Sequence, residues 1–152
     1  MDVIWYDWHK SELTVQRLYE ILALRNEVFI VEQTCPYLDI DGLDLLGDNR
    51  HVAGYQGSDL VAYARILTDS DSLIIGRVIV SPRARGIKLG NRLMEQALAA
   101  CVAHWPGRKV HLSAQAHLQQ FYGRFGFHVV TDIYYEDNIP HIGMDNDPSS
   151  MY

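Results

Sequence analysis

Apolar residues recur at helical spacing near the start of the chain. Between residues 14 and 29 they lie three or four positions apart, and the hydroxyl of Thr14 can cap the first turn. This spacing predicts a helix from Thr14 to about Phe29, after a short strand over residues 3–6. Residues 34–50 are rich in aspartate and glycine, which is typical of a loop.

Three apolar runs follow, and short polar turns separate them. Residues 52–56 and 60–67 flank Gly57-Ser58-Asp59, which is a hairpin signal. Asp69-Ser70-Asp71 then turns the chain into residues 73–80. The pattern predicts three consecutive strands.

The second half of the chain begins with an amphipathic segment. Leu89, Leu93, Ala97 and Cys101 fall on one face of a long helix, which is expected to end before Trp105. Beyond it the pattern predicts a short strand over residues 110–113 and a second helix over residues 116–125. A last long strand is expected over residues 127–135, and a frayed polar tail over residues 145–152.

The order of these elements predicts the fold class. Helices follow the first and third groups of strands and a meander lies between them, which favours an α/β mixed sheet over a repeated parallel unit. The chain has 152 residues, 48% of them hydrophobic, enough for one core and too few for two. We therefore expect a single domain over residues 1–152.

Composition argues against several classes of protein. No apolar run is long enough to span a membrane and the start lacks the features of a signal peptide, so a cytoplasmic protein is expected. Cys35 and Cys101 are far apart and form no pair at metal-ligand spacing, so neither disulfides nor a metal is predicted. The formal net charge of −6 argues against binding to nucleic acid.

The aspartates of residues 39–48 resemble part of a calcium loop only superficially. The twelfth position from Asp39 is Arg50, where a calcium loop needs glutamate. A solvated loop is the expected structure. Attraction of cationic acceptors is the second interpretation.

A basic turn separates the third strand from the long helix. It carries four of the chain's 13 lysines and arginines, and no acid follows until Glu95: Arg83, Arg85, Lys88 and Arg92. Helix N-termini attract anions, and Gly86 and Gly90 would let the backbone approach one closely. The turn therefore predicts phosphate binding, although it fits neither a Walker loop nor a dinucleotide fingerprint.

The motifs around this turn resemble a known family. Residues 75–82 read Ile-Gly-Arg-Val-Ile-Val-Ser-Pro, residues 83–90 read Arg-Ala-Arg-Gly-Ile-Lys-Leu-Gly, and residues 121–127 read Phe-Tyr-Gly-Arg-Phe-Gly-Phe. Together they resemble the acetyl-CoA pyrophosphate loop and the helix-to-strand signature of the GNAT superfamily of N-acetyltransferases. Residues 24–33, 35–37 and 139–144 resemble its ElaA group, so the resemblance covers nearly the whole chain.

The resemblance implies the GNAT fold, a mostly antiparallel central sheet with a splayed parallel pair, flanked by helices. It also implies acetyl-CoA as cosubstrate. The cofactor-binding residues that it implies are Val78, Ile79, Val80, Arg83, Arg85, Gly86, Ile87, Lys88, Leu89, Gly90, Gln115 and His117. Lys88 stands where the family usually has glycine or alanine, and Gln115 where many relatives have asparagine.

Acetyl transfer to an amine needs a neutral nucleophile, a stabilised oxyanion and a proton for the departing thiolate. The resemblance places the hydroxyl of Tyr122 near the sulfur of CoA, which makes Tyr122 the expected general acid. A backbone N–H near Ile79 would polarise the carbonyl. The alternative for Tyr122 is a purely packing role among its neighbouring phenylalanines.

The general base is less well defined by the sequence. Deprotonating a lysine-like amine at pH 7 costs about 4.6 kcal/mol, whereas an α-amine costs only about 1.4 kcal/mol. A weak base would therefore suit an α-amine. Glu32, His111, His117 and His141 are candidates, and Glu32 and His141 are favoured as residues of the acceptor pocket, with His141 in a proline-containing turn.

The leading hypothesis is an N-acetyltransferase that acts on a primary amine of a small molecule or peptide by direct attack. The alternative is a non-catalytic acyl-CoA-binding sensor or interaction module. The sequence leaves the acceptor, the acyl chain and a homodimer open.

Overall fold

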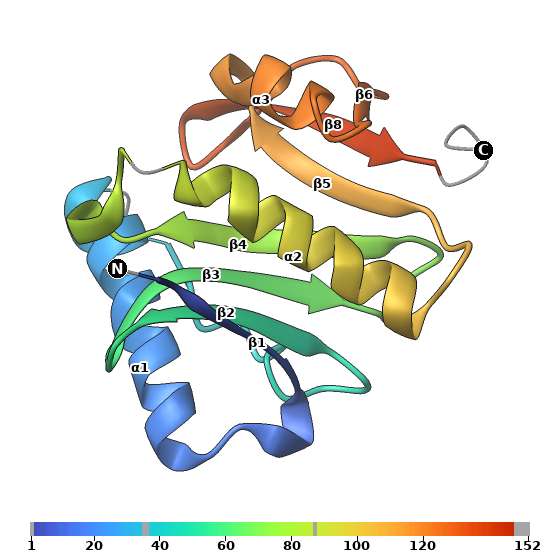
Figure 1. Ribbon diagram of the computed structural model, residues 1–152. Helices are drawn as coiled ribbons and strands as arrows, with labels where there is room; N and C mark the ends of the chain where they lie inside the picture. The colour runs from blue at the N-terminus through green and yellow to red at the C-terminus, as the bar shows by residue number, and fades with distance from the viewer. Residues whose placement is uncertain (1, 35–36, 87, 148–152) are drawn as a thin grey trace.

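The computed structural model describes residues 2–34, 37–86 and 88–147 (Figure 1). Cys35 and Pro36 of the ElaA-like motifs, and Ile87 of the predicted cofactor set, lie outside the described residues. Residues 148–152 of the predicted tail lie outside them as well.

One mixed sheet of eight strands forms the centre of the molecule. Its order is β1-β2-β3-β4-β5-β8-β6, with β7 paired to β8, and every neighbouring pair is antiparallel except β4 and β5. The strands are β1 Ile4–His9, β2 Arg50–Gln56, β3 Asp59–Leu67, β4 Leu73–Val80, β5 Val110–Gln115, β6 His128–Val129, β7 Tyr134–Glu136 and β8 Ile139–Asn146.

Helices cover both faces of this sheet. The larger ones are α1 Val15–Arg25, the π-helix η2 Asn26–Glu32, α2 Leu89–His104 and α3 Gln119–Gly123. The described residues also form the short 3-10 helices η1 Lys10–Glu12, η3 Pro82–Ala84 and η4 Ala116–Leu118. Alternate residues of β2 belong to separate core clusters: Val52 packs with the α2 residues, whereas Ala53 packs with the α1 residues. The two helices therefore lie on opposite faces.

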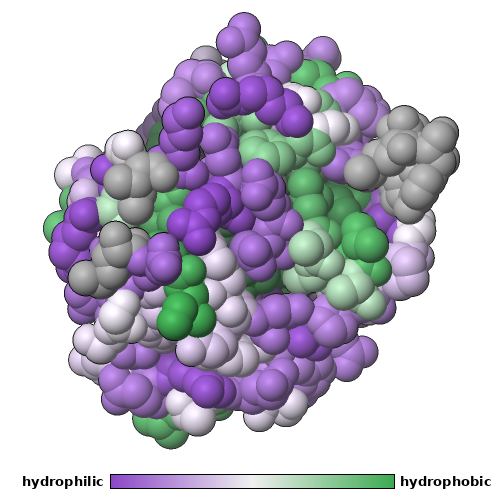
Figure 2. All heavy atoms as spheres, in the orientation of Figure 1, coloured by the Kyte–Doolittle hydropathy of each residue, from purple (hydrophilic) through white to green (hydrophobic). Residues whose placement is uncertain are grey.

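The long helix α2 has the amphipathic character that its sequence predicts. Leu89, Leu93, Ala97 and Cys101 are all buried on its inner side. Burial also raises the pKa of the Cys101 thiol to about 12, as expected for a packing residue. The face of the molecule that carries α2 presents mainly hydrophilic residues, with smaller hydrophobic areas between them (Figure 2).

The predicted elements agree with the structure best in the first two thirds of the chain. The three consecutive strands are confirmed as β2, β3 and β4, and Thr14 caps α1 by accepting a hydrogen bond from the backbone N–H of Arg17 (3.1 Å). The first helix differs from its prediction, because α1 ends at Arg25 and the chain continues as a π-helix.

The predicted last strand over residues 127–135 is wrong. Those residues contribute only the two-residue β6 and the start of β7, and the long final strand is β8. Asp145 and Asn146, which were predicted to belong to the frayed tail, therefore lie in β8. The amide of Asn146, which is 3% exposed, donates to the carbonyl oxygen of Phe125 (2.8 Å).

No helix within the described ranges is long and apolar enough to cross a bilayer.

Candidate active site

The two parallel strands at the centre of the sheet separate along their length. Among the described residues, β4 and β5 pair only at Leu73 with Val110 and at Ile74 with His111. Beyond that point β4 stays paired with β3, and β5 stays paired with β8. A cavity of about 780 Å³ lies between the diverging ends and takes its walls from both sides.

An irregularity in β4 changes which side chains face the two layers. The register with β3 shifts between Tyr63 and Arg65, and Arg77 has a φ of +53°. Side chains along a regular strand alternate, so Ile75 and Ile79 would share one face. Instead Ile75 packs with the α2 cluster and Ile79 with the α1 cluster. The bulge thus redirects the last residues of β4, which line the cavity.

One end of the cavity combines β4 with the basic turn. Val78, Ile79, Val80 and Arg85 line it. Gly86 has a φ of +95° and open space where a Cβ would lie, so a left-handed conformation accounts for this glycine. Gly90 differs, because it lies inside α2 and a Cβ there would come 3.5 Å from the ring of Phe121.

Other predicted residues of the turn lie at the start of α2. Lys88 is its N-cap in a left-handed conformation (φ +56°) and makes no side-chain capping hydrogen bond, and Leu89 is the first helical residue. Arg83 is exposed, and its guanidinium lies 3.9 Å from the carboxylate of Glu27. The N-terminal N–H groups of this helix are therefore not capped by the side chain of Lys88.

Glu32 lines the cavity beside the basic turn. Its two carboxylate oxygens accept hydrogen bonds from Nη1 and Nη2 of Arg85, at 2.8 and 2.7 Å. These bonds lower the pKa of Glu32 from its ordinary value. A carboxylate held ionised in this way is a poor proton acceptor, so the geometry does not favour Glu32 as the general base.

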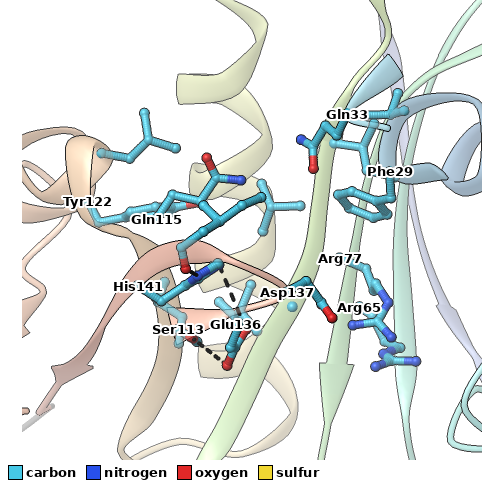
Figure 3. A pocket seen from close by; sticks show the side chains of 18 of the residues that line it. Phe29, Gln33, Arg65, Arg77, Ser113, Gln115, Tyr122, Glu136, Asp137 and His141 are labelled. Carbon is cyan, nitrogen blue, oxygen red and sulfur yellow. Dashed lines mark hydrogen bonds and ion pairs between the residues drawn. The ribbon is translucent and has the colours of Figure 1, made fainter. Parts of the chain in front are cut away.

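Tyr122 lies in the opposite wall, on α3. Its ring packs edge-on against Phe121 and Phe127, and the residue is only 7% exposed although it lines the cavity. Burial raises the pKa of its hydroxyl to about 12. Gln115 lines the same cavity (Figure 3). His117, the other predicted cofactor residue outside the turn, lines it as well.

His141 does not lie in a turn as predicted, but in β8, where it pairs with Gln115 of β5. Its Nδ1 lies 2.8 Å from the carbonyl oxygen of Ile139. A carbonyl can only accept, so in the neutral ring Nδ1 carries the proton and Nε2 keeps its lone pair. Nε2 lies 3.7 Å from a carboxylate oxygen of Glu136 (Figure 3).

Three further residues support His141, and the sequence did not reveal them. The hydroxyl of Ser113 donates to Glu136 (3.2 Å), and the hydroxyl of Tyr134 is hydrogen-bonded to Ser113. The ring of Tyr134 stacks on His141, with centroids 6.3 Å apart. They come from β5 and β7, so only knowledge of the strand pairing could have joined them. His111 is elsewhere, bonded to Asp145 (2.6 Å) and not among the residues that line the cavity.

The acidic segment is not the solvated loop that the sequence predicted. Asp39 and Asp44 are 7% and 6% exposed, because arginines reach them from α1, β3 and β4. Each of three aspartates bridges two arginines. Asp39 contacts Arg25 and Arg77, Asp41 contacts Arg65 and Arg77, and Asp44 contacts Arg25 and Arg65, all within 3.2 Å.

These six residues form a closed ring of alternating charge, which we call the Arg–Asp ring. Burial alone would raise the pKa of Asp41, but hydrogen bonds from Arg65 and from the backbone N–H of Leu43 lower it to about 2. Arg65 and Arg77 also line the cavity, so this wall is polar while its charge is balanced. Pairing with these arginines, rather than attraction of cationic acceptors, explains why the segment is rich in aspartate.

The diverging parallel strands, the basic turn at the start of α2 and the tyrosine on α3 define the class of protein. A profile of the Acetyltransferase (GNAT) domain family matches residues 26–147, and the chain belongs to this family.

The relatives narrow this class further and confirm the resemblance to the ElaA group. Protein ElaA of Escherichia coli (strain K12) is 59% identical over 143 residues, which cover 92% of this chain and 94% of ElaA. The crystal structure of Escherichia coli ElaA superposes with a TM-score of 0.92 at 57% identity, over 95% of this chain and 99% of that one.

A second solved structure is similarly close. The crystal structure of an acyl-CoA N-acyltransferase from Pseudomonas aeruginosa superposes with a TM-score of 0.93 at 49% identity, over 95% of this chain and 99% of that one. Membership of the GNAT family supports acyl-CoA-dependent N-acyl transfer.

Proposed function

We propose that the protein is an N-acetyltransferase, which moves the acetyl group of acetyl-CoA to a primary amine of a small molecule or peptide. The observation that carries this proposal is the cavity between β4 and β5. Val78 to Val80 lie on one wall, and Tyr122 and His141 lie on the other. An acyl thioester and an amine can therefore meet between a possible proton donor and a possible proton acceptor.

The residues of the basic turn suit the phosphates of CoA. The N-terminus of α2 has no side-chain cap, and Arg83, Arg85 and Lys88 add positive charge beside it. The open space at Gly86 would let a phosphate approach the backbone. Backbone groups of Val78 to Val80 would bind the pantetheine arm, and Gln115 and His117 would contact it from β5 and η4.

Tyr122 suits the role of general acid. Because burial raises the pKa of its hydroxyl to about 12, the hydroxyl is protonated at neutral pH and can give its proton to the departing thiolate. Edge-on packing against Phe121 and Phe127 holds its ring in place.

His141 suits the role of general base better than Glu32. In the neutral ring Nε2 can accept the proton that the amine loses as its nitrogen bonds to the acetyl carbon. The carboxylate of Glu136 would then stabilise the positive ring. An α-amine is easier to use than a lysine, because its deprotonation at pH 7 costs about 1.4 rather than about 4.6 kcal/mol.

A thiol-release assay with acetyl-CoA tests the proposal. Amino acids, polyamines and peptides with a free N-terminus should be screened, and release that depends on one class of amine is the expected result. Binding of acetyl-CoA without turnover across the whole panel would favour the non-catalytic acyl-CoA sensor. A cytoplasmic location and a single domain over residues 1–152 remain predictions from the sequence.

A further inference from the structure

The ion pair between Arg85 and Glu32 uses the groups that a phosphate would need. Nη1 and Nη2 of Arg85 both donate to Glu32, and Nε donates to the carbonyl oxygen of Val80 (3.1 Å). All three nitrogens of the guanidinium are thus engaged. While Glu32 holds them, Arg85 cannot offer this parallel pair of N–H groups to a phosphate, and only one outward N–H on each Nη remains.

We propose that Glu32 is an internal competitor for the cofactor, whose carboxylate occupies the place on Arg85 that the diphosphate of CoA takes on binding. The inference rests on the proposed function, namely that this cavity binds acyl-CoA. It gives Glu32 a role in donor binding instead of acid–base chemistry.

The chemistry of the guanidinium allows one anion to replace the other. Its planar pair of N–H groups matches two oxygens of a carboxylate or of a phosphate, so one anion can replace the other without a new geometry. The side chains of Arg85 and Glu32 are 46% and 37% exposed, which leaves the pair open to solvent. Exposed pairs are weak, so a diphosphate that also contacts the start of α2 can displace the carboxylate.

The exchange also affects the strand that faces the thioester arm. Val80 is the last residue of β4, and its carbonyl is covered by Nε of Arg85. When a diphosphate draws Arg85 away, that carbonyl becomes free to accept a hydrogen bond from an amide of the pantetheine arm. A thioester without a diphosphate has no means of displacing Arg85. Glu32 therefore weakens the binding of CoA and leaves the binding of smaller thioesters unchanged.

Binding of CoA to the whole protein, measured by calorimetry at constant ionic strength, tests this role. Glu32→Gln keeps the shape of the side chain and removes its charge, so CoA should bind about two- to tenfold more tightly, which is the range expected from breaking an exposed bidentate pair. Glu27→Gln is the matched control. It removes the same charge from the same helix, η2, where the carboxylate of Glu27 lies 3.9 Å from the guanidinium of Arg83. It should change the affinity for CoA less than Glu32→Gln does.

Two further comparisons assign the effect to Arg85 and to the diphosphate. Arg85→Gln should weaken CoA binding, and adding Glu32→Gln to that variant should restore nothing. Dephospho-CoA, which keeps the diphosphate, should show the same gain with Glu32→Gln, whereas pantetheine should show none. A gain that vanishes with dephospho-CoA, or persists with pantetheine, would overturn the assignment.

The inference and the proposed function fail in different ways. If the wild-type protein binds no CoA, the proposed function is refuted and this inference with it. If the wild type binds CoA but Glu32→Gln binds it equally or more weakly, the inference alone is refuted.

Discussion

At the scale of single residues, the hydroxyl of Tyr122 is the group whose chemistry is easiest to isolate. Tyr122→Phe removes that hydroxyl and keeps the ring that packs against Phe121 and Phe127. A positioned proton transfer contributes about 10²–10⁴-fold, so kcat should fall at least about tenfold, even if water partly replaces the hydroxyl. The affinity for CoA and the melting temperature should stay close to wild type.

Steady-state rates across pH, with an accepted amine, measure the effect of Tyr122→Phe. Single-turnover rates are needed beside them, because slow product release can hide a slower chemical step. Wild-type rates in both measurements would exclude Tyr122 as the acid.

His141 can be tested against a second histidine in the same region of the sheet. His141→Gln removes the nitrogen that faces Glu136, so kcat should fall, and the fall should be larger for amines of high pKa, which give up their proton less readily. His111→Gln is the control, because His111 is bonded to Asp145 and does not line the cavity. Equal losses in the two variants would point to a general effect on the sheet.

At the scale of elements, the turn before α2 and the hairpin between β2 and β3 share a backbone feature. Gly86 and Gly57 both have positive φ, +95° and +63°, and both have open space at the Cβ position. A valine at either site is strained to a similar degree, by roughly 1–3 kcal/mol. Gly86→Val should also lose CoA affinity, because its side chain enters the space that a phosphate would use.

Calorimetry with CoA and thermal melting, run on the same samples, separate strain from binding. Gly57→Val should lower the melting temperature and leave CoA affinity unchanged, and Arg83→Ala should weaken binding less than Gly86→Val does. Full CoA affinity in a folded Gly86→Val protein would contradict the role of the backbone in this turn.

The elements that the sequence predicts well are those defined by neighbouring residues. Strands β2 to β4 are apolar runs bounded by turns, and the basic turn contains its own glycines and charges. Strand β8 was missed because Pro140 and Gly143 weaken its local pattern, and its position depends on pairing with β5, β6 and β7. His141 was named from the sequence, but its partners Ser113 and Glu136 were missed for the same reason.

At the scale of the whole molecule, the Arg–Asp ring shows the limit of composition as a guide. Its members are spread along the sequence from Arg25 to Arg77, although they meet in space. The composition of the acidic stretch gives no sign of the three arginines that contact it. Charge that is paired in this way stabilises the fold only while the aspartates stay ionised. The ring therefore makes the stability of the protein depend on pH.

The sign of that dependence follows from the direction of the pKa shifts. The pKa of Asp41 is about 2 in the folded protein and about 3.9 in an unfolded chain, so its contribution is complete above about pH 4 and is lost as the pH falls through about 2. Burial also lowers the pKa of His51. The stability of the folded protein therefore begins to decline earlier, below about pH 6.5, as the pH falls.

The free energy of unfolding, from urea titrations at several pH values, should therefore decrease slightly from pH 7 to 5 and steeply from about pH 4 to 2. Asp41→Asn cannot titrate, so this variant should be less stable at pH 7 but should lose less stability over the acidic range. Asp48→Asn removes a carboxylate that is 78% exposed, and it should keep the wild-type slope. If Asp41→Asn kept that slope too, the acid sensitivity would have to arise from groups other than Asp41, since a carboxylate that has been removed cannot take up a proton.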